Sequence, residues 1–315
     1  MMFRPTSQDL FFSKNDSHDP RLGEFAKNLE SLSALKKNDL VIAGYPDHEG
    51  IKLSGGRLGA AEAPDLIRKY FYKMTPPLSS DLETFPSLYD FGNLGMEGPL
   101  ESRHDFVAQS VSTALKAGAR WIGLGGGHDY GYPDGLGLLS SGSERPLVIN
   151  FDAHLDVRPP TNGFSSGTPF YRLLSQSLGF DFVEVGIQSQ CNSQNHLAWA
   201  QDKGTRILSY DEIMASGETF SSVTLRFLEK ELLKRRPTYL SLDIDGFSSA
   251  FAPGCSQAFA TGFHPEEFLK LFDILCVRLD VKVLGLYEVS PPLDVDDKTS
   301  KLAALVMHRF VKAYS

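Results

Sequence analysis

The segment with the clearest chemical potential spans residues 150–158, Asn-Phe-Asp-Ala-His-Leu-Asp-Val-Arg. In it, Asp152, His154 and Asp156 follow one another at intervals of two residues. In an extended backbone, side chains two residues apart lie on the same face. Two carboxylates that flank an imidazole suit a hard or borderline divalent cation. The segment therefore predicts a set of metal ligands.

Two further segments carry ligands of the same types. Residues 241–245 read Ser-Leu-Asp-Ile-Asp, which places Asp243 and Asp245 on one face of an extended chain. Residues 125–129 read Gly-Gly-Gly-His-Asp, so His128 follows a glycine-rich turn that lets the backbone approach closely. Each pattern alone also fits a helix N-cap or an ordinary turn. Three such patterns in one chain favour the metal interpretation.

The charges indicate how these ligands combine. The four aspartates Asp152, Asp156, Asp243 and Asp245 gathered in one cleft would repel each other, and two divalent cations would remove that repulsion. With the two histidines, the set matches a two-metal site with ions about 3.5–4 Å apart. No cysteine lies within these segments, which argues against a structural zinc site. We expect two Mn2+ ions per subunit, with iron, cobalt or zinc as alternatives.

A further carboxylate, Glu288, follows the apolar run 281–286. Since the aspartates suffice for the metals, an uncoordinated Glu288 is suited to hold a cationic group of a substrate. The alternative is a carboxylate that caps the next turn.

The elements that must position these groups alternate along the chain. Apolar, strand-like runs are expected at residues 40–44, 88–91, 121–124, 147–151, 182–185, 239–242 and 281–286. Helices are expected at 64–70, 104–117, 168–177, 194–202, 219–234, 265–277 and 300–311. This alternation predicts an α/β fold, a three-layer α/β/α sandwich with a mostly parallel sheet of about eight strands. Ligands bind such sheets at the carboxyl ends of the strands, which is where the candidate residues stand.

The organisation of the chain indicates one catalytic domain. Residues 1–37 are polar and weakly periodic and read as an N-terminal arm, and residues 38–315 read as a single α/β/α domain. The 31 Lys and Arg residues against 39 Asp and Glu give a net charge of -8, which disfavours nucleic acid or an anionic membrane as a partner. Three cysteines without a paired spacing, no secretory leader and no long apolar run favour a cytoplasmic protein. A homo-oligomer is left open.

The combined motifs resemble one known family. GGGHD at 125–129, DAHLD at 152–156, SLDID at 241–245, FAPG at 251–254, YEVSPPLD at 287–294 and GGRLGAAEAPDLIR at 55–68 are similar to signatures of the arginase/agmatinase/formimidoylglutamase superfamily of manganese ureohydrolases. The resemblance covers residues 39–312 and implies an arginase-like fold. It also implies that one metal is held by His128, Asp152, Asp156 and Asp243, and the other by Asp152, His154, Asp243 and Asp245.

Departures from the arginase pattern favour one branch. Arg158 stands where arginases have an asparagine that contacts the substrate, and Ser166 stands where they have a histidine that moves protons. Ser248 and Ser249 replace a common Asp-Pro pair. Together with the segment around Gln188 and Asn192, these features resemble the formimidoylglutamase branch. The resemblance implies substrate contacts by Arg158, Ser166, Gln188, Asn192 and Glu288.

The expected activity is hydrolysis of a linear amidine, N-formimidoyl-L-glutamate, to L-glutamate and formamide in histidine degradation. Arg158 offers bidentate recognition of a substrate carboxylate, and Arg57 and Arg68 either assist it or have structural roles. The catalytic residues are expected to be Glu288, which holds the amidine group, and Asp156, which relays a proton to the leaving nitrogen. Two alternatives remain: a guanidino hydrolase of the agmatinase or arginase type that releases urea, and a metal-binding homologue without activity.

Overall fold

The centre of the molecule is a ten-stranded sheet with the strand order β1-β4-β3-β5-β10-β9-β6-β7-β8, and β2 pairs with β4 beside this path. The computed structural model describes residues 2–82, 85–142, 144–176 and 178–315. Within them the strands are β1 (Phe3–Arg4), β2 (Ala26–Asn28), β3 (Leu40–Gly44), β4 (Leu88–Leu94), β5 (Arg120–Leu124), β6 (Leu147–Phe151), β7 (Asp181–Ile187), β8 (Arg206–Ser209), β9 (Pro237–Asp243) and β10 (Asp280–Tyr287). All the pairings of these strands are parallel except that of β1 with β4.

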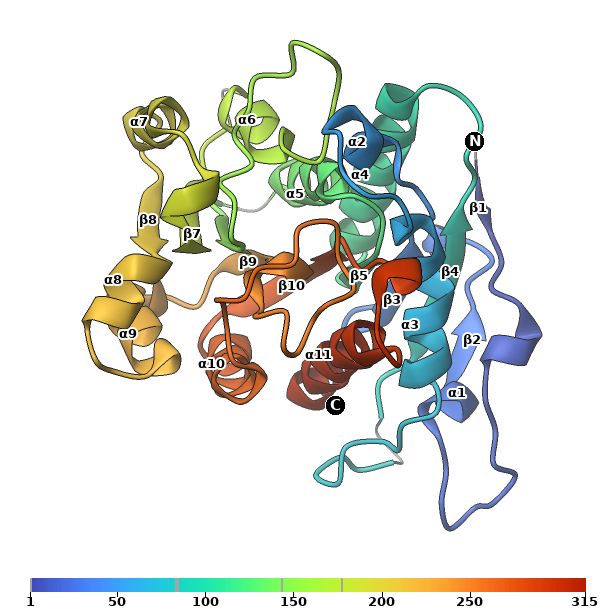
Figure 1. Cartoon of the computed structure of the whole chain (residues 1–315). Coiled ribbons are helices and arrows are strands. Elements are labelled where there is room, and N and C mark those ends of the chain that lie inside the picture. Colours follow the sequence, from blue (N-terminus) through green and yellow to red (C-terminus); the bar gives the residue numbers. More distant parts are fainter. Residues whose placement is uncertain (1, 83–84, 143, 177) are drawn as a thin grey trace.

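Helices cover both faces of this sheet (Figure 1). One layer holds α4 (Leu100–Lys116), α5 (Gly131–Leu139), α6 (Pro169–Leu174) and α7 (Gln194–Asp202). The other holds α3 (Ala63–Phe71), α8 (Tyr210–Ala215), α9 (Phe220–Phe227), α10 (Pro265–Arg278) and α11 (Lys298–Tyr314). Two short helices, α1 (Leu22–Phe25) and α2 (Glu49–Leu53), complete the set. The predicted α/β/α sandwich is therefore confirmed.

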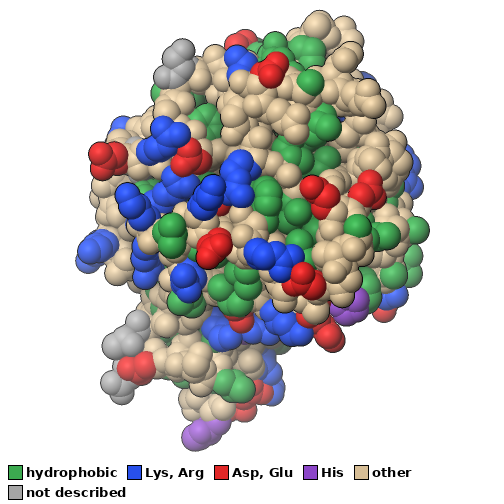
Figure 2. Space-filling model, turned by 90° about the vertical axis from the view of Figure 1, so that its left-hand side faces the viewer, with side chains coloured by type: hydrophobic (Ala, Val, Ile, Leu, Met, Phe, Trp, Pro, Cys, Tyr) green, Lys and Arg blue, Asp and Glu red, His purple; other side chains and the backbone are tan. Residues whose placement is uncertain are grey.

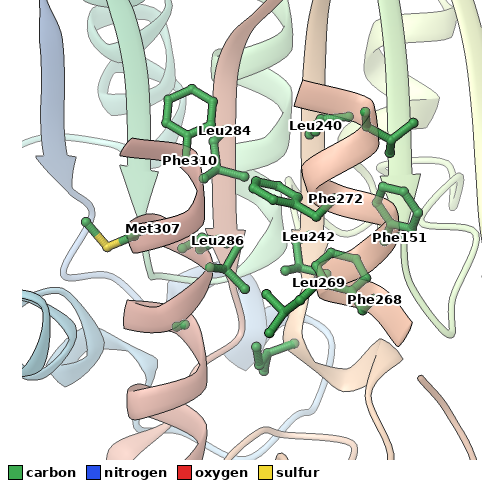
Figure 3. Close-up of a cluster of buried hydrophobic side chains, with 14 of the residues drawn as sticks. Phe151, Leu240, Leu242, Phe268, Leu269, Phe272, Leu284, Leu286, Met307 and Phe310 are labelled. Carbon is green, nitrogen blue, oxygen red and sulfur yellow. The ribbon is translucent and has the colours of Figure 1, made fainter. Parts of the chain in front are cut away.

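The central strands are apolar throughout because both faces of the sheet are covered. Side chains alternate between the two layers: Val148 and Tyr239 belong to the core beside α4–α7, whereas the neighbouring Ile149 and Leu240 belong to the core beside α10 and α11. Figure 3 shows this second core, in which side chains from β6, β9 and β10 meet aromatic and aliphatic side chains of α10 and α11. The continuous apolar runs that predicted strands are thus explained by burial on two sides.

The first 37 residues, predicted as an arm, contribute two strands to the sheet. β1 lies antiparallel to β4 and β2 lies parallel to it, so both extend one side of the sheet. β2 has the sequence Ala-Lys-Asn and is not fully buried, which is why it lacks the apolar signature of a central strand. The short β8, at the opposite edge, escaped the sequence analysis for the same reason.

Several helices also differ from expectation, since α1, α2, α5 and α8 have no predicted counterpart. α5 was not predicted because it contains Gly131, Gly135, Gly137 and Pro133, which lower helix propensity. A Cβ on Gly137 would lie 2.4 Å from Val111 Cβ in α4, so the glycine permits the close contact of these two helices.

The helix predicted at 219–234 is wrong in its length, since α9 ends at Phe227 and a separate 3-10 helix spans Glu231–Leu233. The guanidinium of Arg206 donates to the Phe227 carbonyl at 2.6 Å. This carbonyl is therefore engaged by a side chain at the point where the helix ends.

Basic side chains gather on the side of the molecule that carries α7–α9, with acidic ones among them (Figure 2). Arg236 and Arg145 both pair with Asp181, and Arg206 pairs with Glu231. These three arginines are therefore balanced by neighbouring carboxylates. None of the described helices combines the length and the apolar character that a membrane crossing requires.

Candidate metal centre and substrate cavity

Four neighbouring strands deliver the candidate residues to one edge of the sheet. β5, β10, β9 and β6 are adjacent and parallel, so their carboxyl ends lie together. His128 follows β5, Glu288 follows β10, Asp243 ends β9, and Asp152 follows β6. The sheet order thus brings together residues that are up to 160 positions apart in the chain.

The first group of ligands surrounds the imidazole of His128. Its Nδ1 lies 3.1 Å from Asp152 Oδ2, 3.0 Å from Asp156 Oδ2 and 3.1 Å from Asp243 Oδ2. One ligand atom from each of these four residues lies within 4.8 Å of the others, and all four residues are buried. On the far side of the ring, Nε2 lies 2.8 Å from the Ser241 hydroxyl. This contact suits a protonated Nε2, which leaves the Nδ1 lone pair for a metal ion.

The second group contains Asp152, His154 and Asp245. His154 Nδ1 lies 3.0 Å from Asp245 Oδ2 and 3.5 Å from Asp152 Oδ1. Asp152 therefore belongs to both groups, whereas the structure places Asp243 in the first group only. Asp243 still adjoins the second group, because its Oδ1 accepts a hydrogen bond from the Asp245 backbone at 2.9 Å.

Burial and repulsion between carboxylates raise the pKa values of Asp243 and Asp245, and bound cations would remove that repulsion. Burial, together with repulsion from Asp245 and Asp152, raises the pKa of Asp243 well above its ordinary value. Burial and Asp152 likewise raise the pKa of Asp245 to about 6, although His154 opposes this effect. Burial lowers the pKa of His128, but hydrogen bonds to its three aspartates outweigh burial and raise it. Protons are thus drawn to a site where negative charges crowd.

The donor set fits divalent cations such as Mn2+. All ligand atoms of both groups are carboxylate oxygens or imidazole nitrogens, the donors that suit hard and borderline ions. In the described residues, Asp245 Oδ1 is buried without a hydrogen-bond partner, although buried carboxylate oxygens normally have one. A metal ion beside it would satisfy this oxygen.

Two site residues have unusual backbone conformations. Asp156 has φ of 48° and Glu288 has φ of 64°, values that non-glycine residues seldom adopt. Such conformations cost about 1–3 kcal/mol each and are concentrated at functional sites. At Glu288 the conformation is held by hydrogen bonds, since its N–H donates to the Gly126 carbonyl and its Oε1 accepts from the His128 N–H at 2.9 Å. Burial raises the pKa of Glu288 to about 8, although the His128 N–H lowers it.

Beside the two ligand groups lies a cavity of about 320 Å³. Its lining residues are Ile51, Ser54, Gly56, His154, Asp156, Arg158, Ser166, Gly167, Cys191, Asp243, Asp245, Ser256, Gln257, Phe259 and Glu288. Among these, Arg158 is the one Lys or Arg side chain. The carboxylates of Asp156, Asp243, Asp245 and Glu288 line the same cavity, so a cation and several anions border one space.

Arg158 is available for a ligand. It is exposed, and its guanidinium has no hydrogen bond or ion pair with any residue that the structure describes. It lies along Gly167, where an added Cβ would stand 2.8 Å from its Cδ and 3.0 Å from Nη1. Ser166 also lines the cavity, and its hydroxyl lies 2.9 Å from that of Ser54.

Two predicted substrate contacts are not brought to the cavity. The Gln188 amide bonds to Thr261, with its Oε1 accepting from the hydroxyl at 2.9 Å, and the residue is 2% exposed. Asn192 accepts from the Leu155 N–H and donates to the Ala153 carbonyl, each at 2.8 Å. Both side chains satisfy polar groups of neighbouring segments, and neither is among the residues that line the cavity.

The arginines named as auxiliary candidates have structural contacts. Arg57 donates to the carbonyls of Cys255 and Ser256 and so holds that part of the wall. Arg68 is fully buried and paired with Asp90.

The sequence analysis did not identify several wall residues: Ile51, Ser54, Cys191, Gln257 and Phe259. Phe259 lies 5.6 Å from the His154 ring, centroid to centroid. Neither residue type nor spacing distinguishes these residues from ordinary loop residues, so the sequence held no signal for them.

Comparison with known proteins places this geometry in context. A sequence model described as "Arginase family" matches residues 38–312. Formimidoylglutamase from Staphylococcus carnosus is 28% identical over 325 residues, which is 98% of this chain and 100% of that protein. Formimidoylglutamase from a Staphylococcus aureus strain is also 28% identical, over 99% of this chain and 100% of that protein.

Solved structures show the same likeness. Formiminoglutamase from Trypanosoma cruzi, crystallised with two Mn2+ ions, superposes with a TM-score of 0.81 and 28% identity, over 94% of this chain and 98% of that one. Formimidoylglutamase from Bacillus subtilis superposes with a TM-score of 0.83 and 25% identity, over 96% of this chain and 94% of that one.

Proposed function

The chain belongs to the arginase family, and we propose that it hydrolyses N-formimidoyl-L-glutamate to L-glutamate and formamide. The observation that carries the proposal is one cavity lined by members of two overlapping His/Asp groups, by Glu288 and by the unpaired Arg158. The relatives named formimidoylglutamase, which match the chain over nearly its whole length, support the same activity. We assign this activity to residues 38–315, which contain all the groups concerned.

We assign two Mn2+ ions to the ligand groups. His128, Asp152, Asp156 and Asp243 would hold one ion, and Asp152, His154, Asp243 and Asp245 would hold the other. The fit rests on the crowded carboxylates, the orphaned Asp245 Oδ1 and the Mn2+ ions of the Trypanosoma cruzi relative. Two such ions would supply a nucleophile near neutral pH by lowering the pKa of bound water.

The side chains around the ions orient the substrate. Its two carboxylates call for a cation, and Arg158 can bind one of them through two parallel hydrogen bonds. Its formimino group is cationic when protonated and suits the carboxylate of Glu288. The Gly126 carbonyl holds the Glu288 backbone, and the His128 N–H holds its Oε1. Burial makes an unpaired Glu288 hard to ionise, so a cationic partner would favour its charged form. A substrate bound by both Arg158 and Glu288 would thus have its amidine carbon beside the metal ligands that line the same cavity.

Proton transfer is assigned to Asp156. Cleavage breaks the bond between the formimino carbon and the glutamate nitrogen, and this nitrogen must gain a proton as it leaves. Asp156 lines the cavity and, at 8% exposed, is the most accessible of the four aspartates. Its Oδ atoms are therefore the best placed to pass that proton.

The site of action is assigned to the cytoplasm. Cys191, Cys255 and Cys276 are all free, which suits a reducing compartment.

The proposal is tested by identifying the products. The Mn2+-loaded protein is incubated with N-formimidoyl-L-glutamate, agmatine, L-arginine and guanidino acids, and products are followed by NMR. We expect formamide and glutamate from the first substrate and no urea from the others. Urea release would overturn the proposal in favour of a guanidino hydrolase, and bound Mn2+ without any product would indicate an inactive homologue. Asp243→Asn, which removes a charge of the first ligand group, serves as the inactive control.

A further inference from the structure

A buried row of three charged or polar side chains lies behind the cavity wall. His104 of α4 stands between Arg172 of α6 and Asp129, the residue after His128. Arg172 Nη1 lies 2.8 Å from His104 Nδ1, and His104 Nε2 lies 2.9 Å from Asp129 Oδ2. His104 is 0% exposed and Asp129 is 1% exposed. The proposed chemistry uses none of the three.

The direction of the two hydrogen bonds follows from the groups involved. A guanidinium can only donate, so His104 Nδ1 must accept and cannot carry a proton. His104 Nε2 then carries the ring's proton and donates to Asp129. Burial and the nearby Arg172 also lower the pKa of His104, which is consistent with a neutral ring. The row therefore has a single hydrogen-bond polarity, from Arg172 through His104 to Asp129.

Arg172 is anchored by aromatic rings. Its guanidinium lies 3.4 Å from the ring centroid of Tyr132 and 3.6 Å from that of Phe164. Within the described part of the chain it forms no ion pair with a carboxylate. Phe164 belongs to the loop 159–168, which also supplies Ser166 and Gly167 to the cavity. One end of the row is thus attached to a wall segment.

The other end meets a second wall segment. Asp129 Oδ1 lies so close to Gly50 that a Cβ there would stand 2.0 Å from it. Gly50 is in α2, which supplies Ile51 to the cavity, and its carbonyl accepts a hydrogen bond from the Ser166 N–H at 3.1 Å. The row therefore connects α2, the loop 159–168 and the turn that carries His128.

The metal ligands have separate supports. His128 is held by Ser241, by the Glu288 carboxylate at its N–H, and by the Tyr287 ring, whose centroid lies 4.8 Å from its own. A change at His104 leaves these contacts in place. The row is better placed to order the substrate wall than to retain metal.

We propose that Arg172, His104 and Asp129 form a positioning relay that holds α2 and the loop 159–168 as the substrate wall of the cavity. The relay sets substrate affinity, and it touches neither substrate nor metal. The identity of that substrate rests on the proposed function, whereas the ordering of the wall does not.

The ordering is tested by hydrogen exchange, without reference to activity. His104→Phe keeps a ring of similar size and removes both hydrogen bonds. His104→Gln restores both hydrogen-bonding groups, because the acceptor oxygen and the donor nitrogen of its amide are bonded to one carbon, as the two nitrogens of imidazole are. We expect faster exchange confined to residues 49–56 and 159–168 in His104→Phe, and protection near that of the wild type in His104→Gln. The control His308→Phe removes a histidine of α11 that contacts Thr75 and should leave both segments unchanged. If hydrogen exchange in His104→Phe rose throughout the protein, or did not change at 49–56 and 159–168, the relay would be overturned.

The second test separates KM from kcat in the Mn2+-loaded protein. We expect His104→Phe to raise KM about five- to ten-fold, a factor that corresponds to the loss of one hydrogen bond between the loosened wall and the substrate. The value of kcat and the two bound Mn2+ should change little, and His104→Gln should recover KM. A loss of kcat or of bound Mn2+ with an unchanged KM would contradict the relay. If the wild type itself released no formamide, the proposed function would fail, and the exchange experiment would still decide the relay.

A gentler variant covers the case in which His104→Phe does not fold. Phe164→Leu removes one ring from Arg172 at a half-buried loop position. We expect faster exchange at 159–168 and a raised KM. Phe180→Leu, at a half-buried position beside Phe182, is the matched control. Equal behaviour of the two variants would exclude the relay.

Discussion

Replacing Gly167 with alanine should displace Arg158 and weaken substrate binding without unfolding the protein. The added Cβ would stand 2.8 Å from Arg158 Cδ, closer than a Cβ tolerates, and 3.0 Å from Nη1 and 3.1 Å from Nε, so the side chain must shift. The backbone at Gly167 does not have a positive φ, so alanine meets no conformational penalty there. Arg158 is exposed and can swing away at little cost. The change therefore moves the guanidinium and leaves the fold unaltered.

The expected effect follows from the interaction that is lost. A hydrogen-bonded pair between a guanidinium and a carboxylate contributes about 1.5 kcal/mol at an exposed cavity mouth, which corresponds to about ten-fold in affinity. Because this contact holds the substrate in the ground state and the transition state alike, the loss should raise KM and leave kcat unchanged. Steady-state kinetics with N-formimidoyl-L-glutamate measure both constants.

A double-mutant cycle provides the decisive control. In an Arg158→Ala background, Gly167→Ala should have no further effect on KM, since the side chain that it displaces is already absent. Gly179→Ala is the matched control, because an added Cβ there meets nothing within 4 Å. If Gly167→Ala raised KM equally with and without Arg158, or had no effect in the wild type, the role given to Arg158 would be refuted.

Three further outcomes are expected. Ser241→Ala leaves His128 Nε2 without its hydrogen-bond partner, so the affinity of one of the two sites for Mn2+ should fall about 10–100-fold. Calorimetry measures both affinities, and unchanged values would contradict this role of Ser241. Burial raises the pKa of Asp134 to about 7 in the folded state against about 3.9 when unfolded. The free energy of unfolding is therefore highest below about pH 4, where the carboxyl is neutral, and falls by at most about 4 kcal/mol as the pH rises through 7. Urea unfolding should show a smaller difference in the free energy of unfolding between pH 5 and pH 8 in Asp134→Asn than in the wild type. An equal difference in the two proteins would rule out Asp134 as the origin of the pH dependence. Glu288→Gln keeps an acceptor for the His128 N–H and removes the negative charge. The value of kcat/KM should therefore fall about a hundredfold while both Mn2+ ions stay bound. Full activity would contradict the assignment of Glu288 to the amidine group.

The sequence predicted the elements that carry the site because each is defined by local pattern. The apolar runs before His128, Asp152, Asp243 and Glu288 are buried strands, and parallel strands bring their carboxyl ends to one edge. The alternation of strands and helices, together with the two-residue spacing of the ligands, was therefore enough to predict that these side chains lie together. β1 and β2 could not be predicted, since segments of two and three residues are too short to show a period and pair with β4 only through tertiary contacts.

The cavity wall was harder to predict. Gln188 and Asn192 have the polar side chains of a substrate loop, yet their amides are engaged by Thr261 and by backbone groups of the ligand segment. Gly167 and Ser54 reach the cavity from loops whose course depends on distant contacts. The positive φ values of Asp156 and Glu288 likewise arise from the surrounding structure, because neither residue favours that region on its own.

The central claim is that two divalent cations occupy the His/Asp groups at the carboxyl ends of β5, β6, β9 and β10. Anomalous diffraction from crystals grown with Mn2+ tests it most directly. We expect two peaks about 3.5–4 Å apart, one beside His128 Nδ1 and the other beside His154 Nδ1, with Asp152 between them. A single peak, or none at saturating Mn2+, would contradict the account.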